Sequence, residues 1–132
     1  MTRRYAGEEV IFSAKATTGT GTPYSVPDMM HLMLTLSSQS SANFTIKFQG
    51  SFSDTVPDFS AAQSATNRWD YVQVRDLQNN SAIDGDTGVA FAGTDDVRQF
   101  EANVNGLKWI CATVTARSAG SVNLALQTFS NE

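Results

Sequence analysis

The sequence predicts an all-β protein, arranged as an antiparallel β-sandwich or jelly roll. Apolar residues recur with a period of two along several stretches, as in strands that bury one face. Clusters of Gly, Asn, Ser and Asp, which are typical of turns, separate these stretches. We find no apolar spacing that indicates a helix of ordinary length. A closed barrel is the alternative, because alternation indicates the fold class and leaves the topology open.

The first predicted strand lies in "EEVIFSAKAT", residues 8–17, and the Gly/Thr loop "TGTGTP" follows it. The second, "MHLMLTL", carries apolar residues at alternate positions from 30 to 36. The third lies in "ANFTIKFQGSF", residues 42–52. Its expected buried face consists of Phe44, Ile46, Phe48 and Phe52. The small polar loop "SSQSSA" links the second and third strands, so we predict that these two form a hairpin.

Between residues 53 and 96 the strand patterns are weaker. "RWDYVQVRDL" is predicted to be a strand with Val72 and Val74 facing inward, and "TGVAFAG" a short edge strand. The polar stretch before them is expected to be irregular, with one helical turn possible at "DFSAAQSA".

The last third of the chain is predicted to be a three-stranded meander. Its first two strands, "VRQFEANV" and "LKWICATV", flank Asn105-Gly106. Asn-Gly is the strongest two-residue hairpin signal, because both central residues of a type I′ turn need positive φ. The run "SAGS", residues 118–121, is predicted to turn the chain again. The returning strand is expected to bury Val122, Leu124 and Leu126.

Length and composition indicate one domain that folds without disulfides. The 132 residues are enough for one buried core, and we predict an N-terminal arm at 1–7 and a sandwich domain at 8–132. The single cysteine excludes an internal disulfide. The net charge of −4 argues against binding to nucleic acid, which needs a basic surface. Without the apolar core of a secretory signal or a run able to cross a bilayer, the chain is expected to fold in a cytoplasm and to bind no membrane.

We expect no enzyme activity and no cofactor. Catalysis by the common nucleophile–base route needs a base beside a Ser, Cys or Thr, and no motif of that kind occurs. His31 lies in the middle of a predicted strand, where a polar-face or interface role is expected. Cys111 has no neighbouring Cys or His motif and is expected to be a small packing residue.

A cluster of acidic residues is the weak candidate for a metal site. It consists of Asp84, Asp86, Asp95 and Asp96. Carboxylates on loops are ligands that calcium accepts. The stretch lacks the full EF-hand pattern, and Asp and Gly are also the common residues of turns. We therefore predict no bound metal.

The stretch "GLKWICATVTARSAGSVNLALQ" resembles a C-terminal pattern of small structural proteins of tailed bacteriophages. In that pattern a Gly-hydrophobic-Lys/Arg-Trp strand runs into "xVTAxSxGSVxLxL". The earlier "FTIKFQGSFSD" and "RWDYVQV" look like the same family's "V-x-V-x-G-S-x-D" strand and aromatic strand. The resemblance spans residues 30–127. This chain departs from the pattern in its longer insert "TVPDFSAAQSATN" and in Cys111, where a valine or arginine is expected.

The resemblance implies a virion component, most simply a capsid decoration (cement) protein on the outer head surface, assembled in the host cytoplasm. Its expected partners are the major capsid protein or other virion proteins, and a homo-oligomer, with a trimer favoured. The expected contact residues are Arg3, Arg4, Tyr5, Trp69, Tyr71 and Trp109. Arginine and aromatic residues dominate protein interfaces, and most of these six are predicted to lie off the core face. The alternatives are a head–tail connector, collar, tail or fibre component, or a carbohydrate-binding module with Trp69, Tyr71 and Trp109 as its aromatic platform.

Overall fold

The computed structural model describes the backbone of residues 3–131 and the side chains of residues 5–130. These residues form strands and turns and contain no helix, so none of them forms a helix able to cross a membrane. The strands in chain order are β1 (Arg3–Tyr5), β2 (Glu9–Lys15), β3 (Gly19–Thr20), β4 (Tyr24–Ser25), β5 (His31–Ser51), β6 (Asp70–Tyr71), β7 (Val74–Asp76), β8 (Ser81–Ile83), β9 (Val89–Ala92), β10 (Val97–Asn103) and β11 (Trp109–Asn131). Every pairing is antiparallel, so the predicted all-β antiparallel class is confirmed.

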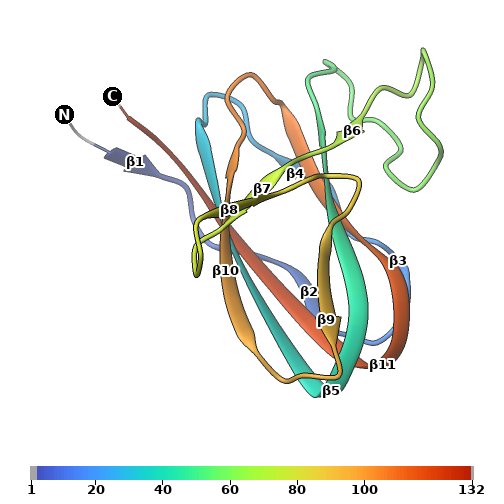
Figure 1. Ribbon diagram of the computed structural model, residues 1–132. Coiled ribbons are helices and arrows are strands. Elements are labelled where there is room, and N and C mark those ends of the chain that lie inside the picture. Colours follow the sequence, from blue (N-terminus) through green and yellow to red (C-terminus); the bar gives the residue numbers. More distant parts are fainter. Residues whose placement is uncertain (1–2, 132) are drawn as a thin grey trace.

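Two long strands, β5 and β11, form the frame of the molecule. They pair from Trp109↔Ser51 at one end to Phe129↔His31 at the other. Each long strand bends once near its middle, where Ser40, Ser41 and Gly120 have φ values of 63°, 54° and 71°. In Figure 1, β5 descends from the upper left, bends at the bottom and rises on the right, and β11 follows the same path in the opposite direction.

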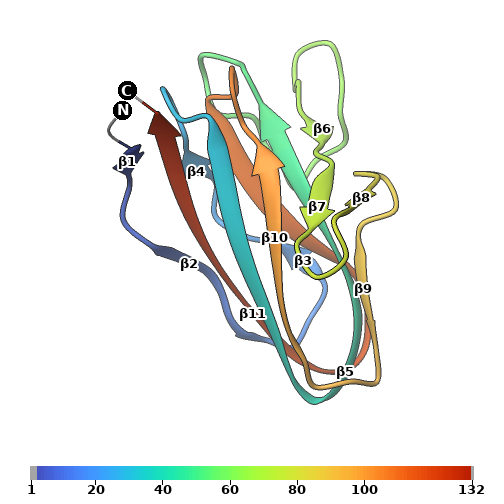
Figure 2. The same cartoon turned by 60° about the vertical axis from the view of Figure 1, so that its left-hand side comes forward.

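The shorter strands extend this ribbon on both edges. The main strand order is β1-β11-β5-β10-β7-β8, while β2, β3 and β4 also pair with β11 and β6 and β9 with β5. Figure 2 shows β2, β11, β5 and β10 side by side in one half of the molecule. Hydrogen bonds thus join all the described strands into a single sheet that is folded over, where two separate sheets are the usual form of a sandwich.

The core lies inside this fold and draws on both halves of each long strand. Even-numbered residues are buried on both sides of the bends, for example Leu34 and Ile46 in β5 and Val114 and Leu124 in β11. Because the parity is kept through each bend, one apolar face of the ribbon lines the interior along its whole length. These residues belong to one hydrophobic cluster that also contains Phe100 of β10.

The predicted hairpins are wrong, although the strands within them are right. The two halves of β5 do not pair with each other across residues 37–42, and β11 runs through residues 118–121 without reversing against itself. Strand β10 pairs with β5 and β7, not with β11, so the meander is wrong as well. At the Asn105-Gly106 turn the positive φ falls on Gly106 and not on Asn105, and Leu107 N donates to Val104 O at 2.9 Å. That pattern is typical of a type II turn, which splays the flanking strands where a type I′ turn would pair them.

Other expectations are met in part. The segment predicted as one strand at 68–77 splits into β6 and β7, with Val74 buried and Val72 packed against the core as predicted. The predicted edge strand contains β9, which pairs with β5 alone among the described strands. Residues 58–65 form no helix, and a single turn links Ala61 N to Asp58 O at 3.2 Å.

Phe52 is the one misplaced residue of the buried face predicted within residues 42–52. Strand β5 ends at Ser51, and Phe52 lies beyond it with 65% of its surface exposed. Alternation stops where the strand stops, so the residue that follows the strand no longer has to face inward.

The N-terminal segment lies along the end of β11. Strand β1 pairs Tyr5 with Phe129, and Ala6 N donates to Thr128 O at 2.9 Å. Residues 1 and 2 of the predicted arm are outside the described residues. The boundary at residue 7 stays a prediction.

Candidate ligand-binding groove

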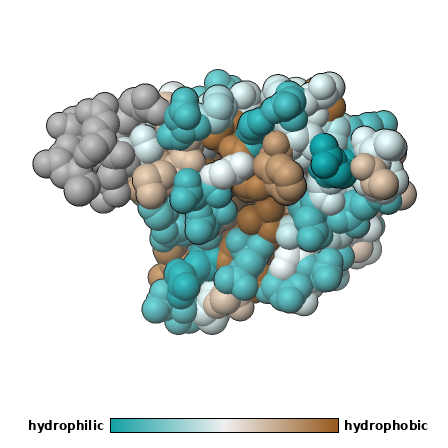
Figure 3. Space-filling view, turned by 90° about the horizontal axis from the view of Figure 1, so that it is seen from above, coloured by the Kyte–Doolittle hydropathy of each residue, from teal (hydrophilic) through white to brown (hydrophobic). Residues whose placement is uncertain are grey.

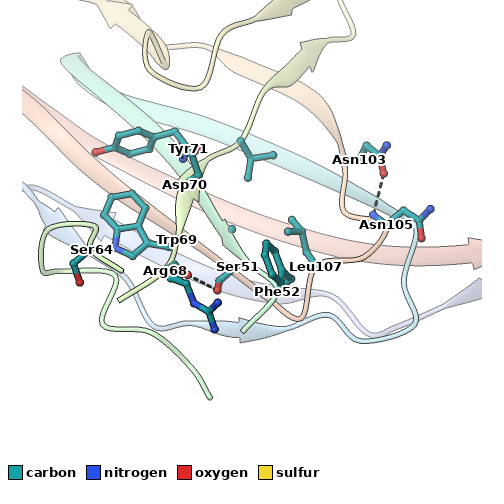
Figure 4. A pocket seen from close by; sticks show the side chains of 12 residues that line it. Ser51, Phe52, Ser64, Arg68, Trp69, Asp70, Tyr71, Asn103, Asn105 and Leu107 are labelled. Carbon is teal, nitrogen blue, oxygen red and sulfur yellow. Dashed lines mark hydrogen bonds between the residues drawn. The ribbon is translucent and has the colours of Figure 1, made fainter. Parts of the chain in front are cut away.

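A groove of about 550 Å³ opens at one end of the folded sheet. The end of β5, the segment around β6 and the turn between β10 and β11 line it together. Figure 4 shows Trp69 and Tyr71 on one side, Phe52 and Leu107 in the middle, and Asn103 and Asn105 at the far end. This volume lies within the range of small-ligand pockets in proteins.

The groove exists because the sheet separates at this end. Strands β7 and β10 pair at Phe100↔Asp76 and Glu101↔Arg75, where buried Asp76 also forms an ion pair with Arg98. Beyond that point the segments next to β7 and β10 separate. Residues 70 and 71 pair with β5, whereas Val104 N donates to Met30 O at 3.0 Å in the other half of the sheet. The space between them is the groove.

Gly50 allows the apolar floor of the groove to close. A Cβ atom at Gly50 would lie 2.8 Å from Leu107 Cδ1 and also 2.8 Å from Val72 Cγ2. Without a side chain at this position, Leu107 and Val72 approach each other over the end of β5. Figure 3, a view from above Figure 1, shows hydrophobic residues gathered in the middle of the visible face and bordered by hydrophilic ones.

Trp69 and Tyr71 form a fixed aromatic pair at one side. Their rings make an edge-to-face contact, with centroids 5.1 Å apart. Trp69 Nε1 donates to Ala61 O at 3.1 Å, and its ring centroid lies 6.1 Å from that of buried Phe59. The Lys47 ammonium lies 4.9 Å from the centre of the Tyr71 ring. Both rings are half-buried, so the prediction that they face outward holds only in part.

The polar residues of the groove keep unused hydrogen-bonding capacity. Asp70 accepts bonds from Tyr71 N at 2.8 Å and Gln63 Nε2 at 3.2 Å, both on Oδ1. Asn103 Oδ1 accepts from Asn105 N at 2.9 Å. Arg68 contributes its carbonyl oxygen, which accepts from Ser51 Oγ at 2.6 Å. None of these bonds uses the following polar groups: Asp70 Oδ2, the amide NH₂ groups of Asn103 and Asn105, and the Arg68 guanidinium.

The structure brings only some of the predicted contact residues together. Trp69 and Tyr71 are in contact, but Trp109 does not line the groove and donates from Nε1 to Ser53 O at 3.1 Å. Tyr5 is 56% exposed on β1, where its ring centroid lies 5.5 Å from that of Phe129. The backbones of Arg3 and Arg4 pair with Asn131 and Ser130, and their side chains are outside the described part.

The sequence did not reveal the other groove residues. The alternation of apolar residues predicts that Phe52 lies in the core, and the turn signal predicts that Leu107, Asn103 and Asn105 belong to a hairpin. The Asn105-Gly106 turn signal was the available clue, because a turn that does not join paired strands leaves its flanking residues free to line a surface.

Three of the four candidate metal-ligating aspartates accept hydrogen bonds from backbone N–H groups, and Asp95 does so from the bend of β5. Asp84 Oδ1 accepts from Asp86 N at 2.8 Å, Asp95 Oδ1 from Ser41 N at 2.7 Å, and Asp96 Oδ1 from Val97 N at 2.9 Å. Among the side chains that the structure describes, no three His, Cys, Asp or Glu residues gather into a site for a metal ion.

His31 faces the polar side of β5. Its ring stacks on Phe129 with centroids 4.9 Å apart, and its Nδ1 lies 3.5 Å from Glu101 Oε1. The contacts of His31 are therefore with an aromatic ring and a carboxylate.

Cys111 is buried, and burial raises the pKa of its thiol from 9.0 to about 11. A shift of this size leaves about 100-fold less thiolate at neutral pH, so the folded protein should react with iodoacetamide about 100-fold more slowly than the unfolded chain. The rate of alkylation with and without urea measures this. Equal rates in the two states would contradict the burial of the thiol.

The raised pKa also gives a pH dependence of stability. Below pH 9 both states are protonated, and the contribution of the neutral thiol is fully present. As the pH rises from 9.0 toward about 11, the unfolded chain loses its proton first and stability falls. A Cys111→Val variant should lack this part of the decline in urea unfolding experiments.

The fold and the groove define a small all-β domain with a ligand-sized cavity at one end. Two solved structures share the fold. The SPBc2 prophage-derived protein YomS matches with a TM-score of 0.70 and 13% identity, over 98% of this chain and 96% of YomS. The PBSX exported protein XepA matches with a TM-score of 0.73 and 12% identity, over 98% of this chain and 39% of XepA. This chain therefore corresponds to well under half of XepA.

No protein family and no curated protein matches the sequence of this chain. The similarity is thus one of fold, and it is shared with proteins derived from prophages.

Proposed function

We propose that this protein is a structural component of a bacteriophage virion, most specifically a capsid decoration protein that binds the outer head surface and stabilises the shell. The observation that carries the proposal is the match over nearly the full length of both chains to a prophage-derived protein. The sequence resemblance to structural proteins of tailed phages points to the same class of protein.

The proposed action is binding without catalysis. The thiol of Cys111 supports this, because it is buried and its pKa is raised, which makes it a poor nucleophile. A decoration protein stabilises the shell by adding interface area that bridges neighbouring capsomers, and this raises the barrier to rupture. A stable interface of this kind buries on the order of 1,000 Å² or more.

Exposed apolar side chains offer surfaces for such contacts with the major capsid protein or with copies of the same chain. Tyr5, Val10 and Val97 are 56%, 63% and 66% exposed on β1, β2 and β10. Exposed apolar side chains of this kind are what neighbouring subunits cover. We propose a homo-oligomer, with a trimer favoured, that needs neither nucleic acid nor membrane.

The alternatives are a connector, collar, tail or fibre component, and a carbohydrate-binding module on the virion. The groove with Trp69 and Tyr71 favours the last of these as an additional activity. The candidate positions on the virion differ in copy number, because a shell has many more binding sites than a neck or a tail.

The copy number of this protein in purified virions is expected to be near parity with the major capsid protein. Quantitative mass spectrometry of the particles measures the ratio directly. A ratio of a few per cent would contradict decoration and assign the protein to the neck, tail or fibres. Absence from the particle would contradict the virion role altogether.

A further inference from the structure

We infer that the groove lined by Phe52, Trp69, Tyr71 and Leu107 binds a neutral saccharide. This inference is independent of where the protein lies on a virion, because it concerns a site within one chain. It rests on the size of the groove, its balance of charge, its combination of apolar and polar lining, and the rigidity of its aromatic residues.

The size of the groove suits one or two sugar rings. Its volume is about 550 Å³, within the range of sites that enclose small ligands. A folded partner would instead need an interface of about 800 Å² on each side, which a groove of this kind does not supply by itself.

The charges that line the groove cancel. Arg68 and Asp70 are its charged residues, and the nearby Lys108 is paired with Asp54. An anionic or a cationic ligand would therefore find no excess of opposite charge to offset the loss of its hydration. A neutral ligand avoids that cost.

The lining requires a ligand that is apolar on its faces and polar at its edges. Phe52, Val72 and Leu107 form the apolar middle, while Asp70 at one side and Asn103 and Asn105 at the other carry acceptors and donors. Hydroxyl groups both donate and accept, so a ligand rich in hydroxyls satisfies this mixed set. A sugar ring combines C–H faces with a rim of hydroxyls, which matches the lining of this groove.

The aromatic side of the groove is held in place before any ligand arrives. Trp69 is fixed by its bond to Ala61 O and by Phe59, and Gln63 Nε2 also donates to Trp69 O at 2.6 Å. Tyr71 is held between Trp69 and the Lys47 ammonium. Fixed side chains lose little conformational entropy on binding, so even a small ligand can gain net affinity from them.

The test is titration of the purified ¹⁵N-labelled protein with cellobiose, lactose and N,N′-diacetylchitobiose, followed by ¹H–¹⁵N NMR. The chain has two tryptophans, and their indole N–H signals report on two places. We expect at least one sugar to shift the Trp69 signal in a saturable way, with a dissociation constant on the order of 1 mM, and to leave the Trp109 signal unchanged. No saturable shift of the Trp69 signal with any of the three sugars would overturn the inference.

Two exposed apolar residues provide a matched pair of variants. Phe52 and Val97 are 65% and 66% exposed, but Phe52 lines the groove and Val97 does not. Phe52→Ala is expected to weaken sugar binding about fivefold, whereas Val97→Ala leaves it unchanged. Equal effects of the two substitutions would also overturn the inference.

A peptide competitor separates the main rival ligand. An acetylated Leu-Phe-Leu amide tripeptide offers apolar side chains without a rim of hydroxyls. If this peptide shifts the Trp69 signal and the sugars do not, the groove is a peptide site and the saccharide inference is wrong. Because the isolated protein is used, either result leaves the virion proposal to be decided by copy number alone.

Discussion

Replacement of Gly120 by alanine is expected to lower the free energy of unfolding by about 3 kcal/mol or more. Gly120 lies at the bend of β11 with a φ of +71°, a conformation that costs an L-residue about 1–2 kcal/mol. A Cβ atom there would lie 2.4 Å from Gln39 O and 2.5 Å from Ala42 Cα, which are backbone atoms at the bend of β5. The two bends would have to move apart, and both halves of the core would be disturbed.

Gly93→Ala is the matched control for this prediction. Gly93 has the same φ of +71°, but a Cβ atom there meets nothing within 4 Å. Its substitution should therefore cost only the conformational part, about 1–2 kcal/mol. Urea unfolding of both variants measures the difference. Equal losses at the two glycines would contradict the close approach of the two bends at Gly120.

Phe100→Ala is expected to cost about 3–5 kcal/mol, the usual range for removing a buried phenylalanine. Phe100 is 1% exposed on β10 and belongs to the single core cluster that both halves of the sheet share. Removing its ring leaves a cavity where β5, β7 and β10 meet. The ion pair between Asp76 and Arg98 joins two of these strands, β7 and β10.

Phe52→Ala serves as the control for Phe100→Ala, because the same side chain is 65% exposed at position 52. Its effect on stability is expected to stay within about 0.5 kcal/mol, as for most surface substitutions. Thermal and urea unfolding measure both variants. A large loss of stability in Phe52→Ala with a small loss in Phe100→Ala would contradict this structure and support the sequence-based prediction that Phe52 lies in the core.

The sequence anticipated the strands well because their evidence is local. Alternating burial in the two halves of β5 and in the second half of β11 follows from side chains that point to opposite faces of a strand. Leu32, Leu34 and Leu36 are buried as predicted, and so are Val122, Leu124 and Leu126. The alternation of apolar and polar residues is enough to predict that these residues are buried, whichever strand lies beside them.

The groove was anticipated only in part, because its residues come from segments far apart in the sequence. The sequence pattern predicts that Trp69 and Tyr71 are aromatic residues near the surface. Nothing in the sequence placed Leu107 or Asn105 beside them, since residues 68–72 and 103–107 meet only after the sheet has folded over. Residue type alone groups Trp109 with that aromatic pair, and the structure places it outside the groove lining.

The sequence by itself determined the all-β class, most of the strands and the side of each long strand that is buried. The tertiary structure alone decided which strands pair. A turn signal such as "SSQSSA" or "SAGS" marks a change of direction, but the halves that it joins can either pair with each other or pack face to face. Here β5 and β11 satisfy each other's hydrogen bonds along their length, so each bends as part of a ribbon and its two halves meet through their side chains. That choice depends on contacts between residues as far apart as His31 and Phe129, which local sequence patterns do not contain.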